Sequence, residues 1–105
     1  MKESDYRLHH DKYAAETRHY SMTRWTHPDH VAICEAGDKA IPFLIADLRK
    51  WREDESQEVD VHLCLTALWK ILRERHPIVP EKSRGVVDDL VDIALKWADE
   101  NPATP

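Results

Sequence analysis

The sequence is poor in glycine and lacks a long hydrophobic run. Two glycines among 105 residues nearly exclude the glycine-rich loops that bind phosphate and the tight turns of β-hairpins. No uncharged apolar run approaches the ~18 residues of a membrane-spanning helix, and residues 1–10 are too polar for a secretory signal. We therefore expect a cytoplasmic protein without a membrane segment.

The two cysteines and the uneven distribution of charge indicate the redox state of the protein and the class of partner that it binds. Cys34 and Cys64 lie in segments predicted to be helical, and we expect reduced thiols rather than a disulfide. The formal net charge is −5, and acidic residues outnumber basic ones after residue 27, which disfavours nucleic acid as a partner. Only residues 1–27 interleave Arg and Lys with Tyr and Trp, a mixture that can stack on bases. A regulator that contacts nucleic acid through this segment is the alternative function.

Helical spacing of apolar residues recurs along the chain, whereas the alternation typical of strands is nearly absent. With 105 residues and 42% hydrophobic content, the sequence predicts one all-α domain of about five helices. Residues 1–27 should form a helix, from about Ser4 to His19, and a linker. The stripe of this helix is aromatic, so we expect it to pack peripherally or against a partner. Its members are Tyr6, Tyr13, Thr17 and Tyr20.

The second and third predicted helices have clear signals at their ends. Pro28 suits the first position of a helix and Gly37 can end one, which predicts a helix over 28–36. Asp38 should cap the third helix. One face of this helix is apolar and the opposite face is charged. The apolar face consists of Ile41, Leu44, Ile45, Leu48 and Trp51, and the charged face of Lys39, Asp47, Arg49 and Lys50.

The fourth predicted helix, from about Glu58 to Arg75, is apolar on several faces and should be the hub of the domain. The charged residues 52–58 before it should form a solvated loop. A fifth helix should follow Gly85. Its stripe comprises Val86, Leu90, Ile93 and Trp97, widened by Val87, Val91 and Ala94. Residues 100–105 contain two prolines and should fray.

Two stretches resemble parts of HEAT-type helical repeats. Residues 36–48, with an early Pro42, resemble the second helix of one repeat, and residues 61–71 resemble the first helix of the next. The layout from Tyr13 to Trp97 is also similar to a family of small bacterial and phage proteins. The matching pieces are Glu16-Thr17-Arg18-His19-Tyr20-Ser21, His27-Pro28, Ala36-Gly37, Ala40-Ile41-Pro42, Ala67-Leu68, Gly85 and Trp97.

The chain departs from this family pattern at its centre. Its charged loop over 52–58 is longer, and residues 61–65 replace an aromatic-rich helix start. The resemblance implies that residues 28–99 form HEAT-like antiparallel helical pairs, as a short solenoid or bundle. It assigns no activity and no site residue.

Seven histidines are the feature of the composition that suggests a site. His27, His30 and Cys34 stand at i, i+3 and i+7, and with Asp29 or His62 they have the residue types of a zinc site. Three ligands from one helix are hard to direct at one ion, so we expect no metal and no cofactor.

Two further groups have the residue types of catalytic sites. Cys34 has His30 four residues before it, but it lacks an orienting acid and an oxyanion-forming turn, and Cys64 with His62 points apart. The clustered carboxylates are those of Asp88, Asp89 and Asp92. They are better explained as a solvated helix face, so we expect no enzyme.

The remaining feature is surplus apolar and aromatic surface, since a fragment of a solenoid has two open ends. Aromatic residues are favoured at protein-binding hot spots. The candidate partner-binding residues are Tyr6, Tyr13, Tyr20, Trp25, Leu63 and Trp69. We therefore expect a non-catalytic adaptor or inhibitor that binds another protein, encoded by a phage or mobile element. The same surface predicts a homodimer.

Overall fold

The computed structural model describes residues 1–17, 27–54 and 59–101, and within these residues the chain is helical and contains no strand. The helices are α1 (Glu3–Thr17), α2 (Pro28–Ala36), α3 (Ile41–Asp54), α4 (Val61–Leu72) and α5 (Val87–Glu100). Short 3-10 turns cover Gly37–Ala40, Arg73–Arg75 and Glu81–Ser83. The all-α prediction is confirmed. None of these helices is long and apolar enough to cross a bilayer.

The ends of α2 follow from local chemistry, as expected. Pro28 occupies the first turn, and the His27 ring accepts a hydrogen bond from the backbone N–H of Asp29 at 3.1 Å. Gly37 ends the helix with φ of 63° and ψ of −138°, a conformation that favours glycine. Both predicted bounds of this helix are therefore confirmed.

The starts of α3 and α4 differ from the prediction. Asp38 does not cap α3, because residues 37–40 form a 3-10 turn and the Asp38 carboxylate instead accepts two bonds from Arg75, at 2.7 and 3.3 Å. Helix α4 begins at Val61 rather than Glu58, because the Asp60 carboxylate caps it by accepting from the Leu63 N–H at 3.0 Å. The predicted loop over 52–58 starts later, since α3 continues to Asp54.

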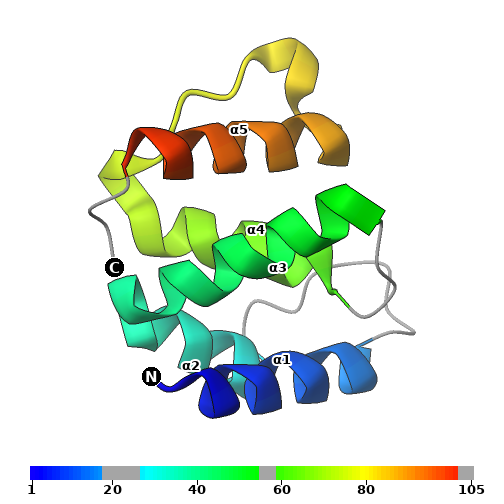
Figure 1. Ribbon diagram of the computed structural model, residues 1–105, viewed down its shortest axis with the longest axis vertical. Coiled ribbons are helices and arrows are strands. Elements are labelled where there is room, and N and C mark those ends of the chain that lie inside the picture. Colours follow the sequence, from blue (N-terminus) through cyan, green and yellow to red (C-terminus); the bar gives the residue numbers. More distant parts are fainter. Residues whose placement is uncertain (18–26, 55–58, 102–105) are drawn as a thin grey trace.

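The helices stack in three levels, with α1 beside α2 at one end, α3 and α4 in the middle and α5 at the other end (Figure 1). Helix α4 contacts α2, α3 and α5, which confirms it as the hub. The dimensions of 31 × 29 × 26 Å are those of a small bundle.

The core is aliphatic around α3 and α4. Four of the five apolar positions predicted for α3 are buried, and Trp51 is partly buried against them. On α5 the stripe is turned relative to the prediction. Val91, Ala94 and Trp97 are buried, whereas Val86 is 42% exposed. Val86 is the residue before the helix and has an extended backbone, so its side chain does not lie on the buried face of α5.

Helix α1 lies at one end of the stack (Figure 1) but is attached more closely than the weak aromatic stripe predicts. It lies against α2, and one complete face of it is buried. That face consists of Tyr6, His10, Tyr13 and Thr17. Its side chains are polar or aromatic, so α1 is attached by hydrogen bonds as well as by packing. The predicted continuation to His19 and the fraying over 102–105 lie outside the described residues.

Candidate functional site

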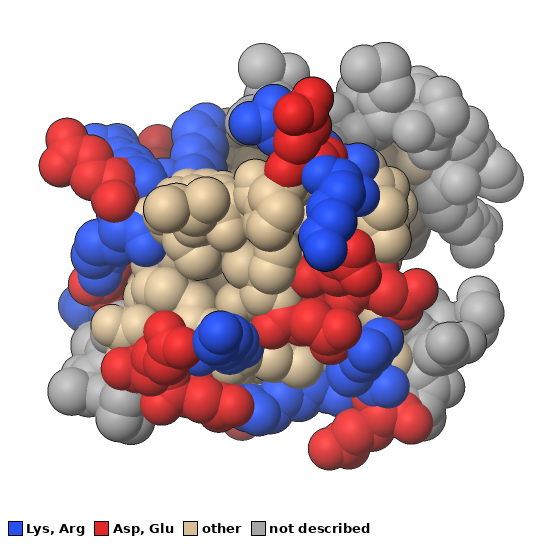
Figure 2. All heavy atoms as spheres, turned by 90° about the horizontal axis from the view of Figure 1, so that it is seen from above, with Lys and Arg blue, Asp and Glu red and all other residues tan. Residues whose placement is uncertain are grey.

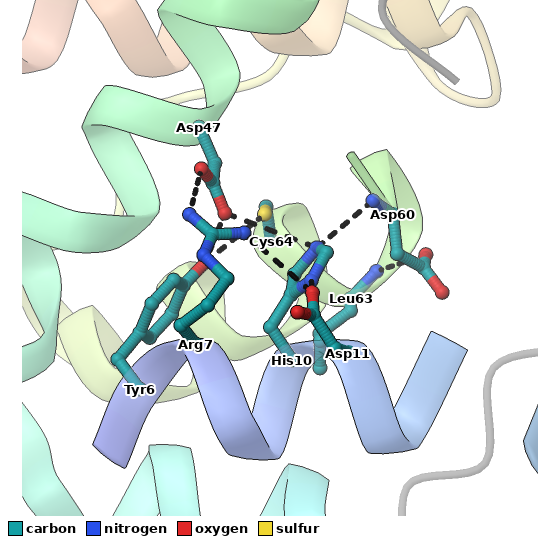
Figure 3. A network of polar contacts seen from close by, with 8 residues as sticks. All are labelled: Tyr6, Arg7, His10, Asp11, Asp47, Asp60, Leu63 and Cys64. Carbon is teal, nitrogen blue, oxygen red and sulfur yellow. Dashed lines mark hydrogen bonds and ion pairs between the residues drawn. The ribbon is translucent and has the colours of Figure 1, made fainter. Parts of the chain in front are cut away.

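A buried polar network joins α1, α3 and α4 around one carboxylate (Figure 3). We call it the Asp47 network, and it comprises Tyr6, Arg7, His10, Asp47 and Cys64. The Tyr6 hydroxyl donates to Asp47 Oδ2 at 2.7 Å, and the Arg7 guanidinium donates to Asp47 Oδ1 at 2.7 Å. Tyr6 also lies 3.6 Å from Cys64 Sγ. Arg7 thus places a positive charge directly beside the buried carboxylate.

His10 completes this network in a defined tautomer. Its Nε2 accepts from the backbone N–H of Asp60 at 3.0 Å, so the ring proton is on Nδ1, which donates to Asp11 Oδ1 at 2.9 Å. Burial raises the pKa of the Tyr6 hydroxyl and that of the Cys64 thiol, so both groups stay protonated. His10, Asp47 and Cys64 lie close enough together to hold a metal ion. Their donor atoms already have partners, however, and we interpret the network as structural.

A second feature is an open cavity between α2 and α4 with a volume of about 560 Å³, which we call the α2–α4 groove. It is lined by Val31, Cys34, Glu35, Gly37, Asp38, Lys70, Ile71 and Arg73. Asp38 is paired with Arg75 outside the lining. Lys70 and Arg73 are exposed and make no ion pair in the described part of the chain. The groove thus combines two cations that make no ion pair among the described residues, the carboxylate of Glu35 and partly exposed apolar side chains.

One wall of the groove contains the cysteine–histidine pair noted in the sequence. Cys34 Sγ lies 3.5 Å from His30 Nδ1, and His30 Nε2 lies 3.0 Å from Thr66 Oγ1. Since the Thr66 hydroxyl donates to the carbonyl of His62 at 2.8 Å, it accepts from His30 Nε2, and the thiol donates to Nδ1. Burial raises the pKa of Cys34, and burial together with Lys70 lowers that of His30. The pair is therefore a neutral thiol hydrogen-bonded to a neutral imidazole.

A third group lies where α1 ends and α2 begins, and we call its four residues His9, Glu16, His27 and Asp29 the Asp29 cluster. His9 Nδ1 lies 2.8 Å from Asp29 Oδ1. His27 Nδ1 lies 3.5 Å from Asp29 Oδ2, and His27 Nε2 lies 3.7 Å from Glu16 Oε1. Asp29 is only 4% exposed, and its Oδ2 has no hydrogen-bond partner.

The structure separates the residues of the predicted zinc set. Cys34 lines the groove and the buried His30 contacts Cys34 and Thr66, whereas His27 faces Glu16 and Asp29. The predicted set of His27, His30 and Cys34 is therefore not brought to one point among the described residues. His62 is exposed on α4.

The predicted partner-binding residues differ in their burial. Tyr6, Tyr13 and Leu63 are buried within the chain itself. The prediction that Leu63 lies on an exposed, partner-binding face of the fourth helix is therefore wrong. Trp69 is partly buried, and its ring lies 4.3 Å from that of His76. Tyr20 and Trp25 lie outside the described residues.

The carboxylates of α5 and the two cysteines are placed as expected. Arg52 pairs with Asp88 at 3.0 Å and with Asp92 at 3.1 Å, and all three side chains are exposed. Cys34 and Cys64 are both free thiols.

Comparisons of the chain with family models, with curated proteins and with solved structures give no match. The likeness to HEAT repeats and to small bacterial and phage proteins therefore stays a prediction.

Proposed function

We propose that the chain is a non-catalytic protein-interaction module, an adaptor or inhibitor, which holds a segment of its partner in the α2–α4 groove. The observation that supports the proposal is that the two cations of the groove make no ion pair among the described residues. Lys70 and Arg73 have no carboxylate partner in the described part of the chain, although the protein is acidic overall. Val31 and Ile71 line the groove beside them. A segment with an apolar side chain next to Asp, Glu or a terminal carboxylate complements this lining.

The state of the groove thiol favours binding over catalysis. A nucleophilic cysteine works as a thiolate or beside a base that is oriented to take its proton. Burial raises the pKa of Cys34, and His30 is oriented by the hydroxyl of Thr66 rather than by a carboxylate. The proposal places the protein in the cytoplasm, where reducing conditions keep Cys34 and Cys64 as thiols.

The surface charge also favours a protein partner over nucleic acid. On the face of the molecule seen from the α5 side, acidic and basic side chains surround an uncharged area and are interspersed (Figure 2). A phosphate backbone is bound by a continuous array of Lys and Arg. Two groove cations are enough for one or two carboxylates but not for such an array.

The test is affinity capture from a lysate of the host, with the full chain and two charge variants as bait. We expect a stoichiometric protein partner that is retained by the wild-type chain and lost with Lys70→Glu/Arg73→Glu. Lys96→Glu, an exposed change on α5, is the matched control and should retain it. A partner captured equally by both variants, or no partner in repeated experiments, would contradict the proposal.

Two solution measurements test the alternative function, through residues 1–27, and the homodimer. Binding of labelled oligonucleotides at physiological salt would support the nucleic-acid regulator instead. Light scattering tests the homodimer, because a mass of 12.3 kDa at high concentration is that of a single chain. A dimer that dissociates with Lys70→Glu/Arg73→Glu would make a second copy the occupant of the groove.

A further inference from the structure

The Asp29 cluster contains a buried carboxylate oxygen that nothing in the described chain satisfies. Asp29 Oδ1 is engaged by His9 at 2.8 Å, whereas Oδ2 has no hydrogen-bond partner. Buried polar atoms are almost always paired, and an unpaired one indicates an ordered water or an ion. Because His9 holds the carboxylate from one side, Oδ2 is kept in a fixed direction, toward His27.

The carboxylates of the cluster also have no permanently charged cation beside them in the described residues. Glu16 and Asp29 supply two carboxylates, and no Lys or Arg in the described residues pairs with either of them. The buried Asp47 differs in this respect, since its charge is matched by Arg7 at 2.7 Å. A divalent cation would balance two carboxylates that come together in this way.

The donor atoms have the spacing of a metal site. One ligand atom each from Glu16, His27 and Asp29 lies within 4.8 Å of the other two. His27 Nδ1 already accepts a hydrogen bond from the backbone N–H of Asp29, so Nε2 is the ring atom left for a metal ion. It lies 3.7 Å from Glu16 Oε1, close to the separation of about 3.4 Å between neighbouring ligands of a tetrahedral zinc ion. The Glu16 side chain is 49% exposed, which gives an ion access from solvent and leaves room for water ligands.

We propose that Glu16, His27 and Asp29 bind a divalent transition-metal ion, with zinc as the first candidate. Calcium and magnesium take six or more oxygen ligands, whereas one imidazole and two carboxylates suit zinc. His9 then acts behind the site, because it orients the carboxylate of Asp29 as outer partners do in metal sites. This set shares only His27 and Asp29 with the group suggested by sequence spacing. The third ligand comes from α1, which removes the difficulty of drawing every ligand from one helix.

The site is independent of the groove and joins the last turn of α1 to the start of α2. An ion bound there would connect Glu16 to His27 and Asp29, so it should stabilise the folded chain. At a free zinc concentration a hundred times the Kd, the expected rise in Tm is about 10 °C. This effect does not require any partner protein, so it can fail or succeed separately from the proposed function.

The experiment uses the full chain, purified without a histidine tag and freed of metal with a chelator. Calorimetric titration with zinc chloride should give one ion per chain, together with the rise in Tm. Glu16→Gln is the decisive variant, because Glu16 is half-exposed and its replacement does not disturb the core. It should weaken zinc binding at least about tenfold, and Asp29→Asn should do the same. His62→Gln, an exposed change outside the cluster, should bind as the wild type does.

A cobalt titration identifies the ligands directly. A complex with Glu16, His27 and Asp29 lacks the thiolate-to-cobalt charge-transfer band that Cys34 would produce, and we expect that band to be absent. The proposal is overturned if zinc does not bind, if Glu16→Gln binds zinc unchanged, if His62→Gln loses binding, or if the thiolate band appears.

Discussion

Replacing Asp47 by alanine should lower the free energy of unfolding by about 4 kcal/mol. The change leaves the Tyr6 hydroxyl buried, with only Cys64 Sγ at 3.6 Å nearby, and an unsatisfied buried donor costs about 1–3 kcal/mol. The hydrogen bond from Tyr6 to a charged acceptor is lost as well, and such bonds contribute about 1.5–3 kcal/mol. The Arg7 side chain is 42% exposed and can be rehydrated, so its share is below about 1 kcal/mol.

Urea unfolding monitored by circular dichroism measures this effect. Asp92→Ala is the control, because Asp92 also pairs with an arginine on a helix but is exposed, and it should change stability by less than about 0.5 kcal/mol. Asp47→Asn keeps the shape and one acceptor and should fall between the two. If Asp47→Ala lowers the free energy of unfolding no more than Asp92→Ala does, the inference that burial makes the contacts of Asp47 strongly stabilising is refuted.

Two further predictions concern pH and the backbone. Burial lowers the pKa of His30 in the folded chain, so the unfolded chain binds a proton that the folded chain resists, and stability should fall as pH drops below about 6.5. His30→Gln should flatten this dependence in urea titrations at several pH values, and an unchanged slope would show that other groups cause it. Gly37→Ala should cost about 1–3 kcal/mol through backbone strain alone, because no atom lies within 4 Å of the added Cβ. Thermal unfolding checks this, and an unchanged Tm would contradict it.

Local signals predicted the helix class and several helix ends. Pro28 and Gly37 bound α2 because each acts on its own backbone, and the apolar spacing of α3 reports burial directly. The prediction that Asp38 caps α3 is wrong because of a contact between residues distant in the sequence. Asp38 is drawn to Arg75, far along the chain, and no local pattern indicates that pairing.

The polar core was missed although part of its signal was present. Asp47 follows Leu44 by three positions, which places it on the same side of α3 as this buried residue. Its charge led to an exposed assignment, since an unpaired carboxylate is costly to bury. Its partner Arg7 and the hydroxyl of Tyr6 lie on another helix, so the compensation appears only in three dimensions. Asp29 and its partner His9 also lie on different helices, so their contact is visible only in three dimensions.

The polar attachment of α1 also affects how the chain assembles. The single leucine of this helix, Leu8, is 65% exposed, so α1 adds no large aliphatic side chain to a collapsing core. Hydrogen bonds have strict geometry, and a slide of α1 by one turn would separate Tyr6 from Asp47 and His10 from Asp60. The hydrogen bonds to Asp47 and Asp60 therefore permit one register of α1 against the aliphatic helices.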